Sequence, residues 1–69
     1  MNGFFKKVTD QGFGFIEGED GSDYFCHKSA FRGKWFTLME NVNAGDKAEV
    51  TFEPTEGPKG KRAENVRLV

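Results

Sequence analysis

Cysteine, histidine and proline are scarce in this chain of 69 residues, and long apolar runs are missing. The single cysteine, Cys26, excludes an internal disulfide and is typical of a reducing compartment, so we expect a cytoplasmic protein. One cysteine and one histidine, His27, do not make a usual metal-ligand set, and we expect neither metal nor cofactor. No apolar run approaches the length of a membrane span and no signal-peptide pattern is seen, so we expect no membrane partner.

A surplus of charge of one sign is also missing. Ten Lys and Arg residues against eleven Asp and Glu residues leave a net charge of −1, which argues against indiscriminate binding to polyanions. The length predicts one domain, residues 1–69, whose modest core needs an architecture that closes on itself. A small β-barrel achieves this because it removes open sheet edges.

Aromatic residues, by contrast, are plentiful, and two short segments concentrate them. Residues 12–16 alternate phenylalanine with glycine and predict a strand, as do the aromatic-rich residues 24–27. Residues 17–22 between them are acidic and rich in turn formers, so the two strands should form an antiparallel hairpin. The glycines of the first segment are weak strand formers, and we expect them to allow curvature and a close approach of the backbone.

Alternation of side chains across a strand predicts which residues of this hairpin face solvent. Ile16 is the natural core residue, and parity then divides the two strands into two sets. The inward set is Ile16, Tyr24 and Cys26, and the outward set is Phe13, Phe15, Phe25 and His27. Four flat rings on one exposed sheet face are costly in water unless something stacks on them. Nucleic-acid bases are suitable partners because each offers a π-face.

Three further segments predict strands, at residues 3–9, 46–53 and 61–68. Their expected inward residues are Phe5, Ala48, Val50, Phe52, Ala63, Val66 and Leu68. Ala63, Val66 and Leu68 do not all fall on the same face of a regular strand, which predicts a bulge or a bend in the final strand.

The connections between these strands carry their own signals. Residues 28–32 predict a single helical or 3₁₀ turn, with Phe31 closing the bottom of a barrel. Residues 33–45 read as a long connection without a convincing helical period, anchored to the core by Leu38 and Val42, and residues 54–60 read as a loop. The whole pattern predicts an all-β fold, a five-stranded antiparallel Greek-key barrel of the oligonucleotide/oligosaccharide-binding type.

These segments resemble the cold-shock domain family over nearly the whole chain. Residues 12–16 match the first ribonucleoprotein motif of the family, and residues 24–27, followed by Ser29 and Ala30, resemble its second. The resemblance implies a five-stranded barrel that binds single-stranded DNA and RNA, often as an RNA chaperone. Nothing in the sequence marks recognition of the ribose hydroxyl, so RNA and DNA both stand as partners.

The resemblance also implies which residues contact nucleic acid. These are Lys6, Phe13, Phe15, Asp23, Phe25 and His27, with Trp35 or Phe36 near the aromatic of the long loop and Lys59 near a basic residue of the last loop. Of Trp35 and Phe36, we expect one to pack on the barrel and the other to be free. The chain departs from the family at Lys7 and Lys28, which stand where aromatic residues are usual. Two stacking platforms are thus exchanged for cations, and we expect both to contribute a salt-sensitive share of the affinity.

Two other classes of function compete with this reading. Sheet edges and aromatic-lined grooves also capture peptides, so a protein-interaction module remains the alternative. An enzyme has little support, because no nucleophile–base pair, carboxylate dyad or metal set is evident. We expect a monomer, and the long connection leaves strand exchange between two copies open.

Overall fold

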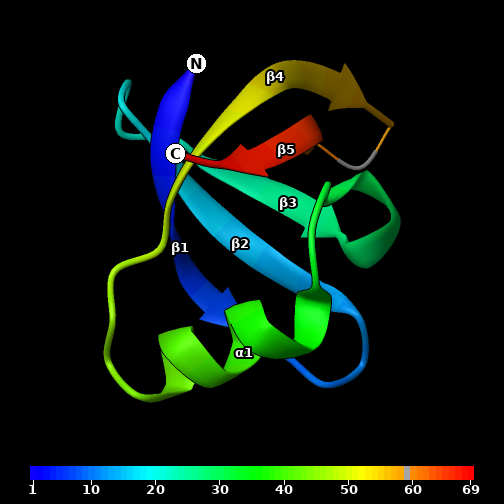
Figure 1. Cartoon of the computed structure of the whole chain (residues 1–69). Coiled ribbons are helices and arrows are strands. Elements are labelled where there is room, and N and C mark those ends of the chain that lie inside the picture. The colour runs from blue at the N-terminus through cyan, green and yellow to red at the C-terminus, as the bar shows by residue number, and fades with distance from the viewer. Residues whose placement is uncertain (59) are drawn as a thin grey trace.

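The computed structural model describes residues 1–58 and 60–69. In these residues, five strands form a closed barrel in the order β1-β2-β3-β5-β4 (Figure 1). The strands are β1 (Asn2–Val8), β2 (Phe13–Gly18), β3 (Asp23–His27), β4 (Glu49–Gly57) and β5 (Gly60–Leu68). Between β3 and β4 lie a 3₁₀ turn, η1 (Lys28–Ala30), and a helix, α1 (Trp35–Asn43). The predicted all-β, five-stranded barrel is confirmed.

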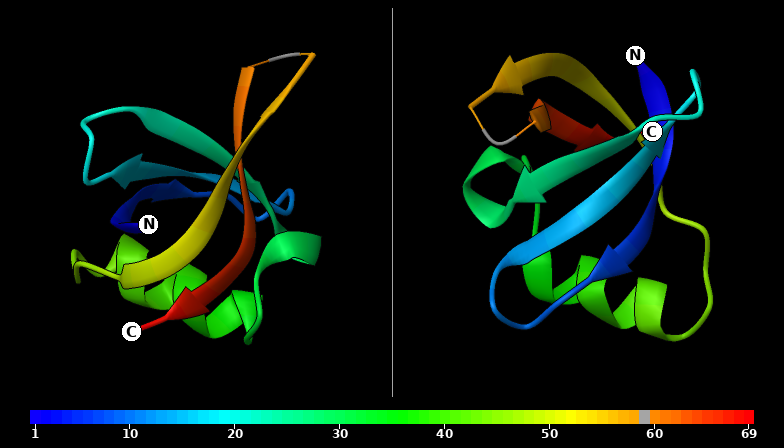
Figure 2. Two further views of the ribbon diagram at one scale, coloured as in Figure 1. Left: turned by 90° about the horizontal axis from the view of Figure 1, so that it is seen from above. Right: turned by 180° about the vertical axis from the view of Figure 1, so that it is seen from behind.

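Neighbouring strands of the barrel are mostly antiparallel. β2 pairs with β3 in the expected hairpin, and β1 pairs with both β2 and β4. β4 and β5 form a second hairpin, which projects beyond the other strands (Figure 2). The barrel closes where β3 meets β5 in parallel, with Phe25 opposite Arg62.

The core follows the alternation that the sequence predicts. The buried residues include Phe5, Ile16, Tyr24, Cys26, Ala48, Val50, Phe52, Ala63 and Val66. The prediction for Leu68 is wrong, since its side chain is 52% exposed. Leu68 pairs with the buried Val50, but it is the last residue of β5 and lies at the rim of the barrel.

Bulges interrupt two of the strands. The predicted irregularity in β5 is confirmed, because the pairing with β4 shifts between Thr51 and Glu53, opposite Asn65, whose φ is +50°. A second shift lies in β1 between Phe5 and Lys7. It turns Phe5 toward the core and Lys7 outward, although the two residues have the same parity in the sequence.

The prediction of an irregular connection is wrong for the residues that form α1. Trp35, Leu38, Met39 and Val42 recur at the i, i+3, i+4 and i+7 spacing of a helix face, and all four pack on the core. The helix lies across one end of the barrel (Figure 1). Leu38 is fully buried and Val42 packs against the core, so both predicted anchors are confirmed.

The predicted boundaries of the second hairpin are also corrected. The predicted strand 46–53 begins at Glu49 and runs to Gly57, and pairing with β5 continues from Pro54 opposite Ala63 to Gly57 opposite Gly60. Cross-strand pairing therefore outweighs the local turn signals that predicted a loop over residues 54–60. In the described part of the chain, no helix has the length and apolar character needed to cross a bilayer.

Candidate nucleic-acid interface

Three phenylalanine rings touch one another on the outward face of β2 and β3, and they define the aromatic patch: Phe13, Phe15 and Phe25. The rings of Phe13 and Phe25 are stacked, with centroids 5.9 Å apart and planes at 24°. Phe15 meets both edge-on, at 6.2 Å from Phe13 and 5.9 Å from Phe25. These stacked and edge-on contacts stabilise the arrangement of the three rings.

The hairpin register explains how these rings come together. Phe15 lies directly opposite Phe25, and Phe13 lies opposite His27, so all four side chains share one face. Phe15 is 37% exposed, His27 is exposed, and the other two rings are half-buried against their neighbours. The prediction that these residues face outward is confirmed.

The backbone of β2 lies close to β1, as expected from the glycines. A Cβ at Gly14 would sit 2.5 Å from the carbonyl oxygen of Lys7 and 3.3 Å from the ring of Phe5. Glycine is therefore required at this position, because any side chain would push β1 and β2 apart.

His27 is oriented by the 3₁₀ turn that follows it. Its Nδ1 accepts the backbone N–H of Ser29 at 3.1 Å and lies 2.8 Å from the hydroxyl of the same serine. In the neutral ring with Nδ1 as acceptor, the proton is on Nε2. The contact caps η1 and fixes the imidazole beside Phe13.

Two of the predicted cations, Lys7 and Lys28, flank the patch. Lys7 lies opposite Phe15 across the β1–β2 ladder, on the outward face. Lys28 donates its backbone N–H to the carbonyl of Gly12 at 2.8 Å, and its aliphatic stem lies over that glycine. Both side chains are exposed, so both ammonium groups are available to a ligand on the patch.

Lys6 and Asp23 bind each other beyond the end of the patch that Phe15 and Phe25 form. The Lys6 ammonium is 3.4 Å from a carboxylate oxygen of Asp23 and 3.7 Å from one of Glu17. All three side chains are substantially exposed, so the pairing contributes little to the free energy of folding.

A groove of about 750 Å³ continues the patch toward the turn between β4 and β5. Its walls are formed by Phe15, Asp23, Phe25, Pro58, Gly60, Lys61 and Arg62. The Lys61 ammonium is 2.8 Å from the Ser22 hydroxyl. The sequence left open whether Lys61 and Arg62 contact phosphate or only form a solvated loop, because only the β3–β5 pairing brings them beside Phe25. Lys59, the predicted basic contact of this loop, lies outside the described residues.

Of the two aromatic residues at the start of α1, one packs on the barrel and one is free, as predicted. Trp35 meets the rings of Phe5 and Phe31 edge-on, at 6.2 and 6.0 Å. Its indole N–H donates to the carbonyl of Thr9 at 3.1 Å. Phe36 is 66% exposed on the helix. The ring contacts of Trp35 are thus with core residues and not with the aromatic patch.

Cys26 lies under the patch, on the inward side of β3. Burial, together with the charge of Glu64, raises the pKa of its thiol to about 12. The thiol therefore stays protonated, as expected of a small buried apolar residue.

The barrel and its aromatic face agree with the comparison to known proteins. The family model described as the 'Cold-shock' DNA-binding domain matches residues 1–69. The chain belongs to the cold-shock domain family. The resemblance seen in the two aromatic motifs is thereby confirmed.

Members of the cold-shock domain family from several bacteria are similar to the chain over most of its length. Cold shock protein 2 of Lactiplantibacillus plantarum is 43% identical, over 86% of this chain and 82% of that protein. The cold shock-like protein CspA of Stigmatella aurantiaca is 45% identical, over 86% and 81%. Cold shock protein CspB of Bacillus caldolyticus is 42% identical, over 84% and 80%.

Proposed function

We propose that this cold-shock domain binds single-stranded DNA or RNA by stacking bases on the aromatic patch and on His27. The observation that carries the proposal is the outward cluster of three phenylalanine rings in mutual contact. Each base stacked on an aromatic ring contributes about 1–3 kcal/mol. A few such contacts, after the cost of ordering the strand, give dissociation constants of about micromolar or lower.

The charges around the patch define the second part of the interaction. Four cations are placed to meet phosphates: Lys28 near Phe13, Lys7 beside Phe15, and Lys61 and Arg62 along the groove. Each phosphate that is neutralised adds about 0.7 to the slope of log affinity against log salt for a single strand. A duplex should bind poorly, because paired bases hide their faces within the stack.

Binding of unpaired strands gives the domain the action of an RNA chaperone. A protein that binds only the open form of a hairpin shifts its equilibrium toward that form by mass action, without ATP. We place this activity in the cytoplasm, in agreement with the single, buried cysteine. The alternative of a protein-interaction module has no comparable support from the family.

The test is a titration of oligothymidine into the double variant Phe13→Ala/Phe25→Ala. Removal of two stacking platforms should weaken binding by about 2–6 kcal/mol, while circular dichroism shows an intact barrel. Leu68→Ala, which removes an exposed apolar side chain at the rim of the barrel and outside the patch, is the control and should bind like the parent. Unchanged affinity of the double variant would refute the proposal.

A further inference from the structure

The groove beside the aromatic patch has a guanidinium group and a carboxylate on two different sides of the Phe25 ring. Arg62 is opposite Phe25 where β5 meets β3, and both residues line the groove. Asp23 precedes Phe25 by two residues on the same face of β3 and lines the groove as well. A flat ligand stacked on Phe25 would thus have Arg62 about 5 Å away across the strands and Asp23 about 7 Å away along the strand.

The Arg62 side chain is held from two sides. Its Nη2 lies 3.4 Å from a carboxylate oxygen of Glu64, two residues further along β5. Its Cδ lies 3.2 Å from the position that a Cβ would take at Gly57, so its aliphatic part passes close over that glycine. The ion pair engages Nη2 and leaves Nε and Nη1 outside it. A guanidinium group has five N–H donors, so Arg62 keeps donors for a ligand in the groove.

The other two charged side chains of the groove are partly engaged. The Lys61 ammonium lies 2.8 Å from the Ser22 hydroxyl. One carboxylate oxygen of Asp23, Oδ1, lies 3.4 Å from the Lys6 ammonium, and Oδ2 takes no part in that pair. Asp23 therefore still offers an acceptor, and the groove combines this acceptor with the planar donor group of the arginine.

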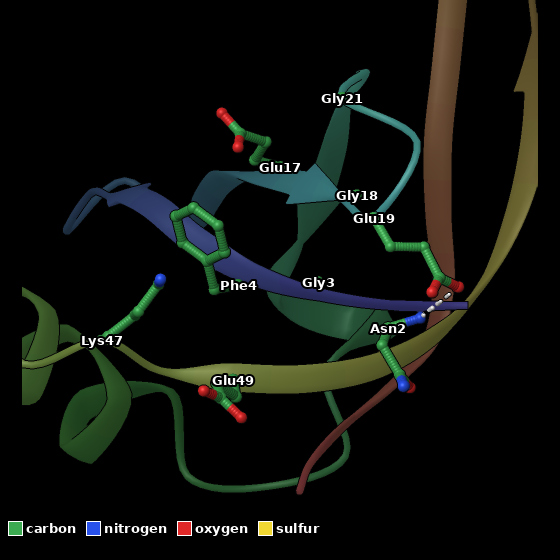
Figure 3. A pocket seen from close by; sticks show the side chains of 9 residues that line it. All are labelled: Asn2, Gly3, Phe4, Glu17, Gly18, Glu19, Gly21, Lys47 and Glu49. Carbon is green, nitrogen blue, oxygen red and sulfur yellow. Dashed lines mark hydrogen bonds between the residues drawn. The ribbon is translucent and has the colours of Figure 1, made fainter.

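A smaller hollow of the surface is less suited to a nucleotide. It has a volume of about 340 Å³ and lies between the starts of β1 and β4 (Figure 3). Its one aromatic ring, Phe4, already has the Lys47 ammonium 4.3 Å from its centre. Glu17, Glu19 and Glu49 line the same hollow and would repel a phosphate. The groove beside Phe25 is therefore the hollow in which a base can be both stacked and hydrogen-bonded.

Guanine matches the two polar groups of the groove better than the other bases do. Its O6 and N7 accept two parallel N–H groups of an arginine, and its N1–H and N2 amino group donate to a carboxylate. These two edges adjoin in the plane of the base. Thymine and uracil have the same order of groups, O4 and then N3–H, but only one group for each partner. Adenine would place its N6 amino group against the guanidinium and its N1 acceptor against the carboxylate.

We infer that Arg62 and Asp23 make this groove select guanine in a bound single strand. The inference rests on the proposed function and adds base selectivity to it. The rings of the aromatic patch stack on any base, whereas Arg62 and Asp23 distinguish one base from another by its edges. Both side chains are about half exposed, so we expect a guanine at this position to improve affinity by about five- to tenfold.

The experiment measures affinity for short oligothymidines in which guanine replaces one thymine at each position in turn. At one position the parent should bind the guanine strand about five- to tenfold more tightly than oligothymidine. Adenine at that position should bind no more tightly than thymine. The analogue 7-deazaguanine lacks the N7 acceptor and should lose most of the gain.

Arg62→Lys tests the arginine, because lysine keeps the charge but cannot form two parallel N–H contacts. The gain from guanine is measured relative to oligothymidine on the same variant, so a change in overall affinity cancels. It should fall below about twofold, and guanine and 7-deazaguanine should bind equally. The control Arg67→Lys makes the same exchange at an exposed position of β5 opposite Thr51, and it should keep the full gain.

Asp23→Asn tests the carboxylate, since an amide can also donate to N1 of adenine. The difference between guanine and adenine at the selected position should shrink in this variant. The inference is overturned if that difference is undiminished, if the gain from guanine survives in Arg62→Lys, or if 7-deazaguanine equals guanine on the parent.

The parent itself separates this inference from the proposed function. If it binds oligothymidine but gains nothing from guanine at any position, the selectivity is wrong and the proposed function stands. If it binds none of the strands, the proposed function itself is wrong, and the inference falls with it.

Discussion

At the scale of single residues, Lys7 illustrates how a backbone irregularity decides the chemistry of a surface. The bulge in β1 between Phe5 and Lys7 turns Lys7 outward, opposite Phe15. With regular alternation along β1, Lys7 would share the face of the buried Phe5 and point into the barrel. An ammonium group thus occupies a position next to a stacking ring, where it can neutralise a phosphate but cannot hold a base.

A prediction follows for Lys7→Trp, which exchanges this cation for a stacking platform. One additional stacked base should strengthen oligothymidine binding by about 1–3 kcal/mol. At the same time the slope of log affinity against log salt should fall by about 0.7, because one phosphate contact is lost. Titrations at several salt concentrations measure both effects. Lys34→Trp, at an exposed position before α1, is the control, and an equal change there would contradict the prediction.

Cys26 gives a second prediction at this scale. Its pKa is raised from 9.0 to about 12 in the folded protein, so the thiolate that reacts with disulfide reagents is scarce. We expect no labelling of the native protein at pH 8 within the time in which an unfolded control is fully labelled. Rapid labelling under native conditions would show that the thiol is not enclosed as described.

The same shift links stability to alkaline pH. The folded state holds the thiol proton more tightly, so this contribution to the free energy of unfolding is complete below about pH 9. It declines as the pH rises toward 12. Denaturant unfolding at pH 8 and pH 11 should show a smaller alkaline loss in Cys26→Ala than in the parent, and an equal loss would exclude the linkage.

At the scale of elements, the sequence allowed the β2–β3 hairpin and its outward rings to be predicted almost completely. The two strands are adjacent in the chain, and alternation around Ile16 determines the faces of both. Helix α1 was missed because its apolar face has only four members within nine residues, Trp35, Leu38, Met39 and Val42, and the apolar Phe36 lies off that face and obscures the period. Elements that depend on distant partners could not be predicted in this way.

The groove beside the patch shows the same dependence on distant partners. Lys61 and Arg62 join the site only because β5 closes against β3, and the pairing of β4 with β5 extends past Pro54 against its local preference. Neither effect has a local signal in the chain. The rings of the site could thus be found from the sequence, whereas the basic side of the groove could not.

The end of α1 provides a prediction about stability. The N–H of Gly45 bonds to the carbonyl of Val42 at 3.1 Å, and the N–H of Asp46 bonds to that of Asn41 at 2.9 Å. This Schellman motif requires a positive φ at Gly45, which is +90°. Gly45→Ala should therefore destabilise the fold by about 1–2 kcal/mol in urea unfolding. Space is not the cause, because no atom lies within 4 Å of the added carbon.

Gly45→Asn is the matched variant for this effect, since asparagine adopts positive φ more easily than alanine. Its loss of stability should be smaller than that of Gly45→Ala. Equal losses in the two variants would show that the conformation of this residue does not limit the helix end.

At the scale of the whole molecule, closure of the barrel bears on the oligomeric state. In the described part of the chain, each strand has two neighbours in the closed order, so no long unpaired edge is offered to a second copy. We expect the protein to sediment as a monomer at micromolar concentration, with and without a short oligonucleotide. A concentration-dependent dimer would indicate exchange of strands between copies.

In the described residues, a single residue pair joins β3 to β5, and this pairing affects how easily the barrel opens. Phe25 and Arg62 form this pair, and both also line the groove. A nucleic-acid strand bound in that groove would contact both β3 and β5. Amide hydrogen exchange where these two strands pair should therefore be slower in the complex than in the free protein. Release of the nucleic acid should then be coupled to the separation of β3 from β5.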